Sequence, residues 1–201
     1  MVDERVLALA ACVGLLILLR IIRHRRLAPL RAASEMLHTA DALWHHATAI
    51  PPAHLTTPLR RAVAGALKQY AAALDTGPLR YHTPVLYARS HRVLSLPKRN
   101  PLQRRAASIS EHCKAIAELL VQAHKHGQLD GQALEEAQMA ATLSAEMADI
   151  DALSGKAQRA AKLRLFQQAD VYRSAALDCC DRLPPQAAER VRRVVTSKLA
   201  Y

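Results

Sequence analysis

The chain has 201 residues, a formal net charge of +11 and a pI near 10.0. Aromatic residues make up only 3% of it, while alanine recurs throughout, which argues against a sheet-rich protein and for helices packed at close range. The sequence has only 6 glycines and contains no P-loop, no Gly-x-Gly-x-x-Gly and no Gly-x-Ser-x-Gly motif. Composition therefore excludes the common nucleotide-binding and hydrolase classes, and we expect an all-α protein that is not an enzyme.

The N-terminal region is dominated by an apolar stretch from Val6 to Leu19. A membrane-spanning helix needs about 20 mostly apolar residues. Continuing the stretch through Ile22 gives a short but workable span, because Arg20 can extend its guanidinium group to the lipid headgroups. We therefore predict that residues 1–27 form a single transmembrane anchor and that residues 28–201 form a helical domain.

Three alternatives for this stretch remain open. A cleaved signal peptide has a basic head, whereas Asp3 and Glu4 precede the apolar run here. Residues 9–12 resemble a lipoprotein cleavage box that would lipidate Cys12, although the apolar run continues past the cysteine. The third alternative is a buried N-terminal helix of a soluble protein, since apolar runs of about 10–14 residues are often core helices.

The charge on the two sides of the stretch predicts its orientation. Lysine and arginine accumulate on the cytoplasmic side of membrane helices. The side preceding the stretch carries only Arg5, while the following side carries several arginines. These membrane-flanking residues are Arg20, Arg23, Arg25 and Arg26. We predict a single-pass protein of a bacterial inner membrane, with its N-terminus outside and residues 28–201 in the cytoplasm.

Residues 28–201 show apolar and small side chains at spacings of three and four, which predicts a bundle of five or six antiparallel helices. The expected helices cover residues 29–49, 57–74, 109–126, a stretch from Asp130 onward, a long segment ending near Leu183 and a last helix after Pro184-Pro185. Thr57 is expected to cap the second of these, and Thr83-Pro84 to begin a short helix through Leu94. Ser154-Gly155 is expected to end one helix, and Leu165 is assigned to the buried stripe of the helix that follows.

Two groups of residues have spacings that occur in metal sites. Glu35 and His38 show the Glu-x-x-His pattern of di-iron bundles, and Asp41 and His45 continue the same row. A ferritin-like site needs a second copy of the pattern, which the sequence lacks. The other group consists of His112, His124 and His126. It has no Cys or acidic residue at the spacing that a metal site would need. We therefore predict neither a metal nor a cofactor.

The four cysteines are Cys12, Cys113, Cys179 and Cys180. They form no Cys-x-x-Cys pair, and neighbouring cysteines in a helix point in directions about 100° apart. We expect them to be reduced residues of the packed interior in a reducing compartment.

Charge is distributed in blocks along the rest of the chain. No acidic residue lies between Asp75 and Glu111, and no lysine or arginine lies between Lys125 and Lys156. The candidate contacts to an anionic partner are Arg89, Arg92, Lys98, Arg99, Arg104 and Arg105. Three arrangements of the basic segment 80–105 remain open: it is solvated, it docks on the acidic residues 130–151 of its own chain, or it lies on anionic lipid.

These observations favour an integral membrane protein whose helical domain is a non-catalytic interaction or scaffold module for a protein partner or a second copy. The alternative is a tethered binding domain for anionic lipid or nucleic acid through residues 80–105. Nucleic acid is the weaker of these two ligands, because the sequence shows no helix-turn-helix or RRM-like signature. A third alternative is an accessory subunit of an enzyme whose chemistry lies in the partner.

Overall fold

The structure is a computed structural model that describes residues 4–52, 54–96 and 109–198. Within these ranges it contains seven α-helices, one 3₁₀ turn and no strand, so the predicted all-α class is confirmed. The elements are α1 (Glu4–Ala49), α2 (Thr57–Asp75), η1 (Arg80–His82), α3 (Thr83–Leu94), α4 (Ile109–Lys125), α5 (Gly131–Lys162), α6 (Phe166–Cys180) and α7 (Pro185–Lys198). The prediction of five or six helices is one or two too low, because the short helix expected from Thr83 is a complete helix, α3, in addition to the six longer stretches that were expected.

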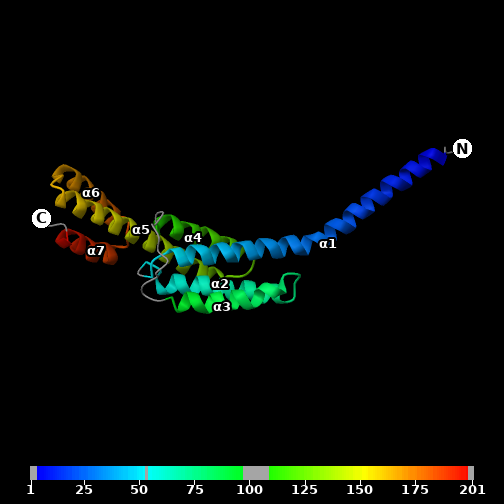
Figure 1. Ribbon diagram of the computed structural model, residues 1–201, viewed down its shortest axis with the longest axis horizontal. Helices are drawn as coiled ribbons and strands as arrows, with labels where there is room; N and C mark the ends of the chain where they lie inside the picture. Colours follow the sequence, from blue (N-terminus) through cyan, green and yellow to red (C-terminus); the bar gives the residue numbers. More distant parts are fainter. Residues whose placement is uncertain (1–3, 53, 97–108, 199–201) are drawn as a thin grey trace.

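Helix α1 is a single element of 46 residues whose two halves have different surroundings. Its N-terminal half projects away from the bundle, and its C-terminal half lies within it (Figure 1). The helix bends near Pro29, which lacks the N–H for one helical hydrogen bond and whose ring presses on the preceding turn. In the C-terminal half, Ala40, Leu43 and Ala47 are fully buried.

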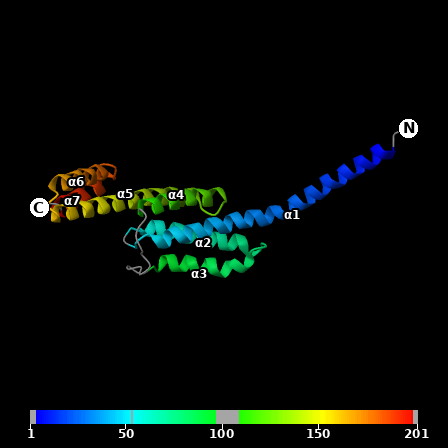
Figure 2. The same ribbon diagram turned by 45° about the horizontal axis from the view of Figure 1, so that its top comes forward.

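The first hydrophobic core joins the C-terminal half of α1 to α2, α3, α4 and the first half of α5. Its large, fully buried side chains include Leu43, Leu59, Leu67, Tyr70, Leu86, Ile116 and Leu120. Alanines fill the space between them, which allows the helices to approach closely. In Figure 2, α4 runs beside α5, while α3 lies at the edge of the bundle and packs mainly on α2.

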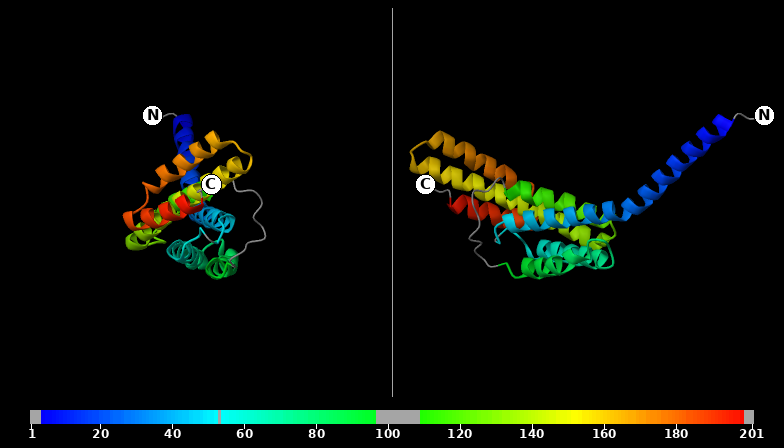
Figure 3. Two further views of the ribbon diagram at one scale, coloured as in Figure 1. Left: turned by 90° about the vertical axis from the view of Figure 1, so that its left-hand side faces the viewer. Right: turned by 45° about the vertical axis from the view of Figure 1, so that its right-hand side comes forward.

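A second, smaller core joins the last part of α5 to α6 and α7. Ile150 and Ala157 of α5 pack there with Ala176 and Cys180 of α6 and with Val195 of α7. Helix α5 is 32 residues long and takes part in both cores. It is therefore the element that holds the two ends of the bundle together (Figure 3).

The boundary between α5 and α6 differs from the prediction. Helix α5 continues through Ser154 and Gly155, because one glycine costs a helix only about 1 kcal/mol and packing on two cores offsets that. It ends where Arg164 adopts a positive φ of 58°. The N–H of Leu165 then donates to the carbonyl of Ala160, and that of Arg164 donates to the carbonyl of Ala161, which is a Schellman motif. Leu165 is exposed in this turn, so its assignment to a buried stripe is wrong.

The turn between α1 and α2 is fixed by one arginine. The guanidinium group of Arg60 donates to the carbonyls of Leu55 at 2.8 Å and Pro52 at 2.9 Å. Helix α2 begins at Thr57 as expected, but its N-cap residue is Thr56 rather than Thr57. The hydroxyl group of Thr56 forms no capping hydrogen bond, so Arg60 is the polar side chain that holds this turn.

The predicted transmembrane anchor is not confirmed. Among the residues that the structure describes, no helix combines the length and the apolar character that a bilayer crossing requires. The side chains of residues 1–12 lie outside the described part of the chain. From Val13 to Ile22, the large apolar side chains of α1 are all exposed.

Candidate functional site

A groove with a volume of about 530 Å³ lies between α2 and the start of α5. We call it the α2–α5 groove. One wall carries Arg61 and Lys68 of α2, and the other carries Asp130 and Glu136 at the start of α5. All four charged side chains are exposed, and Gly65 lies between the walls.

Two local signals place the start of α5 against α2. Gly127 ends α4 with a φ of 71°, and the N–H of the next residue, Gln128, donates to the carbonyl of Ala123 at 2.8 Å. Asp130 then caps α5, since its carboxylate accepts the N–H of Ala133 at 2.7 Å. The glycine and the cap together fix a tight reversal of the chain. The position of the groove is therefore set by the α4–α5 turn.

The chemistry of the α2–α5 groove is that of a binding surface. Its lining consists of cations, carboxylates, amides and small or apolar residues, and it includes no Ser, Cys or His. A Cβ atom added at Gly65 would meet nothing within 4 Å, so the centre of α2 leaves open space at this point. The separation of positive and negative walls favours a ligand that carries both charges in the opposite arrangement.

A second hollow, of about 510 Å³, lies between α1 and α4 and is polar. It brings Glu35 and His38 of the Glu-x-x-His pattern to His126 at the end of α4. The Nδ1 atom of His126 is 3.1 Å from the hydroxyl oxygen of Tyr70, whose pKa burial raises to about 12. In the ranges that the structure describes, no three His, Cys, Asp or Glu side chains lie together in a way that would hold a metal ion.

Three histidines meet at the interface of α1 and α4. The Nδ1 atoms of His46 and His112 are 2.8 Å apart, and the ring centroids of His45 and His46 are 5.6 Å apart. Burial lowers the pKa of His46 below 6.5, and the neighbouring His112 and His45 lower it further. His112, which the sequence grouped with His124 and His126, thus pairs with a histidine of α1 instead.

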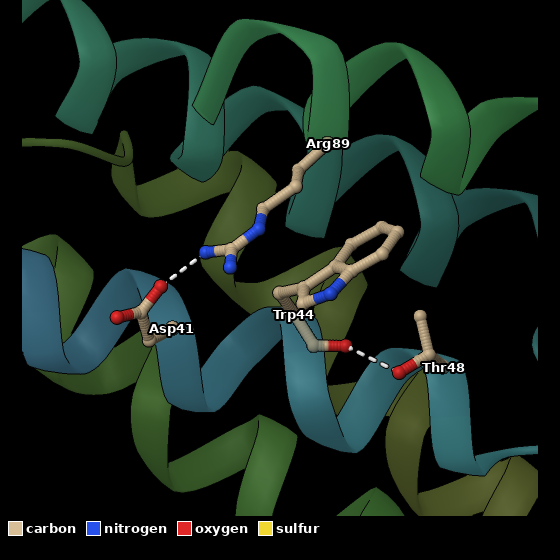
Figure 4. A network of polar contacts seen from close by, with 4 residues as sticks. All are labelled: Asp41, Trp44, Thr48 and Arg89. Atoms are coloured by element: carbon tan, nitrogen blue, oxygen red, sulfur yellow. Dashed lines mark hydrogen bonds and ion pairs between the residues drawn. The ribbon is translucent and has the colours of Figure 1, made fainter. Parts of the chain in front are cut away.

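Of the predicted contacts to an anionic partner, Arg89 is already engaged within the chain. Its guanidinium group pairs with the carboxylate of Asp41 on α1 and lies 5.8 Å from the centroid of the Trp44 ring (Figure 4). Beside them, the Thr48 hydroxyl donates to the Trp44 carbonyl at 3.0 Å. Arg89 therefore joins α3 to α1 and does not dock on residues 130–151.

The remaining predicted basic residues are placed as follows. Arg92 is exposed on α3. Lys98, Arg99, Arg104 and Arg105 lie outside the described residues. Arg20, Arg23 and Arg25 are exposed on α1, and the side chain of Arg26 lies outside the described part. Because Lys98, Arg99, Arg104 and Arg105 lie outside the described residues, the structure does not test whether segment 80–105 binds lipid or nucleic acid.

The described cysteines lie in the interior and are free. Cys113, Cys179 and Cys180 are all buried, and none forms a disulfide. Burial raises the pKa of the Cys113 thiol to about 11, and a nearby carboxylate, Asp149, adds to the shift. A thiol with a raised pKa is a poor nucleophile at neutral pH, so these residues serve packing.

Sequence reasoning missed the α2–α5 groove, because its walls come from helices that are far apart in the chain. Its one sequence signal was Gly65 in the middle of a helical pattern, where a packing or functional reason is expected. No protein-family model matches the chain, and neither a curated protein nor a solved structure shows significant similarity to it.

Proposed function

We propose that the protein is a membrane-tethered, non-catalytic interaction module of the bacterial inner membrane. In this proposal residues 6–22 insert into the bilayer, and the bundle holds a protein partner beside it on the cytoplasmic side.

The observation that carries the proposal is the continuity of α1. The same helix presents consecutive exposed apolar side chains from Leu15 to Leu19 and then supplies the buried Leu43 to the first core. Leu16 is 66% exposed. Because five consecutive residues of a helix cover all its faces, no single partner helix would bury them, whereas lipid surrounds the helix on every side. Removing such surface from water gains about 25 cal/mol per Å².

The charges next to this region favour the cytoplasmic location of the bundle. Arg20, Arg23 and Arg25 are exposed immediately before the bend at Pro29. With residues 6–22 inserted, these arginines would lie at the headgroups of the cytoplasmic leaflet, where arginine and lysine accumulate. The bend then lets the bundle leave the membrane at an angle to the inserted segment.

Within this function, we assign the α2–α5 groove to an amphipathic segment of the partner. That segment would place acidic residues along Arg61 and Lys68 and basic residues along Asp130 and Glu136. Opposed charges set the register and direction of a docked segment more than they add affinity. The open space at Gly65 would admit an apolar side chain of the partner.

Two measurements on the full-length chain test the anchor: a topology reporter at the C-terminus and alkaline extraction of membranes. We expect the protein to stay in the membrane fraction after alkaline extraction, with a C-terminal reporter active only in its cytoplasmic form. Replacing Leu16 and Leu18 by lysine should release it. Release of the unchanged protein, or periplasmic activity of the reporter, would overturn the proposal.

The groove is tested by photocrosslinking from position 69 in native membranes. A Gly65→Trp variant should abolish the crosslink to the partner, because the indole fills the groove. Gly155→Trp is the matched control, since Gly155 also lies inside a helix with open space at its Cβ position but far from the groove. A crosslink that survives Gly65→Trp, or one that joins two copies of this chain, would contradict the assignment.

A further inference from the structure

The turn between α5 and α6 exposes an unusual set of large apolar side chains. At the turn Leu163 is 70% exposed and Phe166 is 56% exposed, and Leu165 is exposed between them in the chain; further along α6, Val171 is 67% exposed. Phe166 is the only phenylalanine in the chain. We call Leu163, Leu165 and Phe166 the α5–α6 tip. Exposed apolar side chains scattered singly are normal in proteins, but a cluster of this kind indicates an interaction surface.

The shape of the tip is convex and fixed. It lies at the end of a helical hairpin, where the Schellman motif at Arg164 turns the chain back. Figures 1 and 3 show this turn at the end of the molecule opposite to the N-terminal half of α1. The apolar side chains therefore project outward from the molecule and do not line a groove.

Basic residues lie on both sides of the apolar side chains in the sequence. Arg159, Lys162 and Arg164 are exposed at the end of α5 and in the turn, and Arg173 follows on α6. The only acidic residue between positions 159 and 173 is Asp170. An exposed apolar group flanked by cations is complementary to a surface that is anionic outside and apolar beneath.

We propose that the α5–α6 tip binds the surface of an anionic lipid bilayer. Leu163, Leu165 and Phe166 enter the boundary between headgroups and acyl chains, while the flanking cations contact lipid phosphates. A bilayer is the occupant that fits best, because its soft surface closes around a convex tip, whereas a rigid protein would need a pocket of matching shape.

This inference goes beyond the proposed function, because it concerns the opposite end of the molecule and a second membrane contact. A chain anchored through α1 holds the tip away from the anchoring bilayer, as the views in Figures 1 and 2 agree. The tip would then bind a stretch of anionic bilayer separate from the one that holds α1. The tip itself does not require the anchor, so the two proposals fail separately.

The first experiment measures binding of a second membrane. Full-length protein is reconstituted into phosphatidylcholine nanodiscs, which enclose the N-terminal half of α1, and mixed with fluorescent vesicles. The vesicles contain phosphatidylcholine with or without about one third phosphatidylglycerol. We expect co-flotation with the anionic vesicles alone. Protein that fails to enter nanodiscs refutes the anchor only, and is then tested directly on the vesicles.

Matched substitutions identify the surface that binds. Leu165→Ser with Phe166→Ser should weaken binding about tenfold or more, which corresponds to about 1.4 kcal/mol. The control is Val85→Ser with Met139→Ser, since these exposed apolar residues lie on α3 and α5 away from the tip. Likewise, Arg159→Glu with Lys162→Glu should abolish binding to anionic vesicles, whereas the groove variant Arg61→Glu with Lys68→Glu should not. Equal losses in test and control variants would overturn the proposal.

A second readout reports insertion and does not depend on affinity. Phe166→Trp in a Trp44→Phe background leaves one tryptophan at the tip, and circular dichroism checks that the helices are retained. We expect a blue shift of its fluorescence and quenching by brominated lipids in anionic vesicles. Met139→Trp in the same background should show neither effect. An unshifted, unquenched tryptophan at position 166 would assign the tip to a partner other than lipid.

Discussion

His46 on α1 and His112 on α4 share one hydrogen bond between their Nδ1 atoms, which lie 2.8 Å apart. A neutral imidazole has one donor and one acceptor nitrogen, so one ring must donate and the other must accept. If both rings were protonated, two N–H groups would face each other at this distance. The interface of α1 and α4 therefore depends on at least one of the two histidines being neutral.

We predict that the bundle loses stability as the pH falls below about 6.5. The pKa of His46 is lower in the folded protein than its value of 6.5 in the unfolded chain, so the unfolded chain binds more protons in this range. The stability is complete above pH 6.5 and decreases as the pH falls toward the folded pKa. His46→Gln should reduce this slope, measured as thermal midpoints of the full-length protein in mild detergent at several pH values. A slope that His46→Gln leaves unchanged would contradict this assignment.

Gly65→Ala should stabilise the protein by about 0.5–1 kcal/mol. Gly65 lies inside α2, where glycine is less favourable than alanine, and an added Cβ atom would meet nothing within 4 Å. Denaturant unfolding of the full-length protein measures the change. Gly127→Ala is the informative comparison, because its φ of 71° strains any residue with a Cβ atom, and it should destabilise by about 1 kcal/mol. A loss of stability in Gly65→Ala would show that α2 is packed more tightly there than the structure indicates.

Arg164→Gly should change two measurements in opposite directions. Arg164 occupies the left-handed region at the end of α5, the same position in a Schellman motif that Gly127 occupies at the end of α4. Glycine relieves that strain, so stability should rise by about 0.5–1 kcal/mol. Binding to anionic vesicles should fall, because the tip loses one cation. Arg159→Gln removes a cation without changing a strained position and should weaken binding alone.

The second core should open before the first. Helix α7 contributes Val195 as its buried large side chain, while Ala187, Ala188 and Val191 are partly buried and Val194 is exposed. Amide hydrogen exchange of the full-length protein should therefore be faster in α6 and α7 than in α2 and α4. Val195→Ala should accelerate exchange in α7 and leave the first core unaffected. Equal protection of all these helices would show that α5 couples the two cores into one cooperative unit.

Much of the helical pattern was predictable, because its signals are local. Thr83-Pro84 marked the start of α3, Asp130 marked the cap of α5, and Gly127 marked the end of α4. The break between α5 and α6 was not predictable, since a positive φ at an arginine leaves no signature in the sequence. Gly155 was expected to end a helix, because a glycine in a sequence does not by itself show whether it lies in a turn or inside a packed helix.

The candidate sites depend on contacts between distant parts of the chain, and most of them could not be predicted. Arg89 and Asp41 are 48 positions apart, so the blocks of charge along the chain do not indicate that these two residues pair. Arg61 and Glu136 face the same groove from helices that are separated by α3 and α4. The exposure of Phe166 follows from its place at the start of α6, directly after the turn, which the sequence pattern did not locate.

Helix α1 continues through the bend at Pro29 as one element, so it joins its exposed apolar residues to the bundle at a fixed helical phase. At about 1.5 Å per residue, 46 residues extend over about 69 Å. Because the helix is continuous, the rotational position of α1 at Arg20 determines which face of the bundle points in a given direction. Inserting one alanine before Pro29 would rotate the bundle by about 100° relative to the N-terminal half, and inserting a full heptad would nearly restore the original direction.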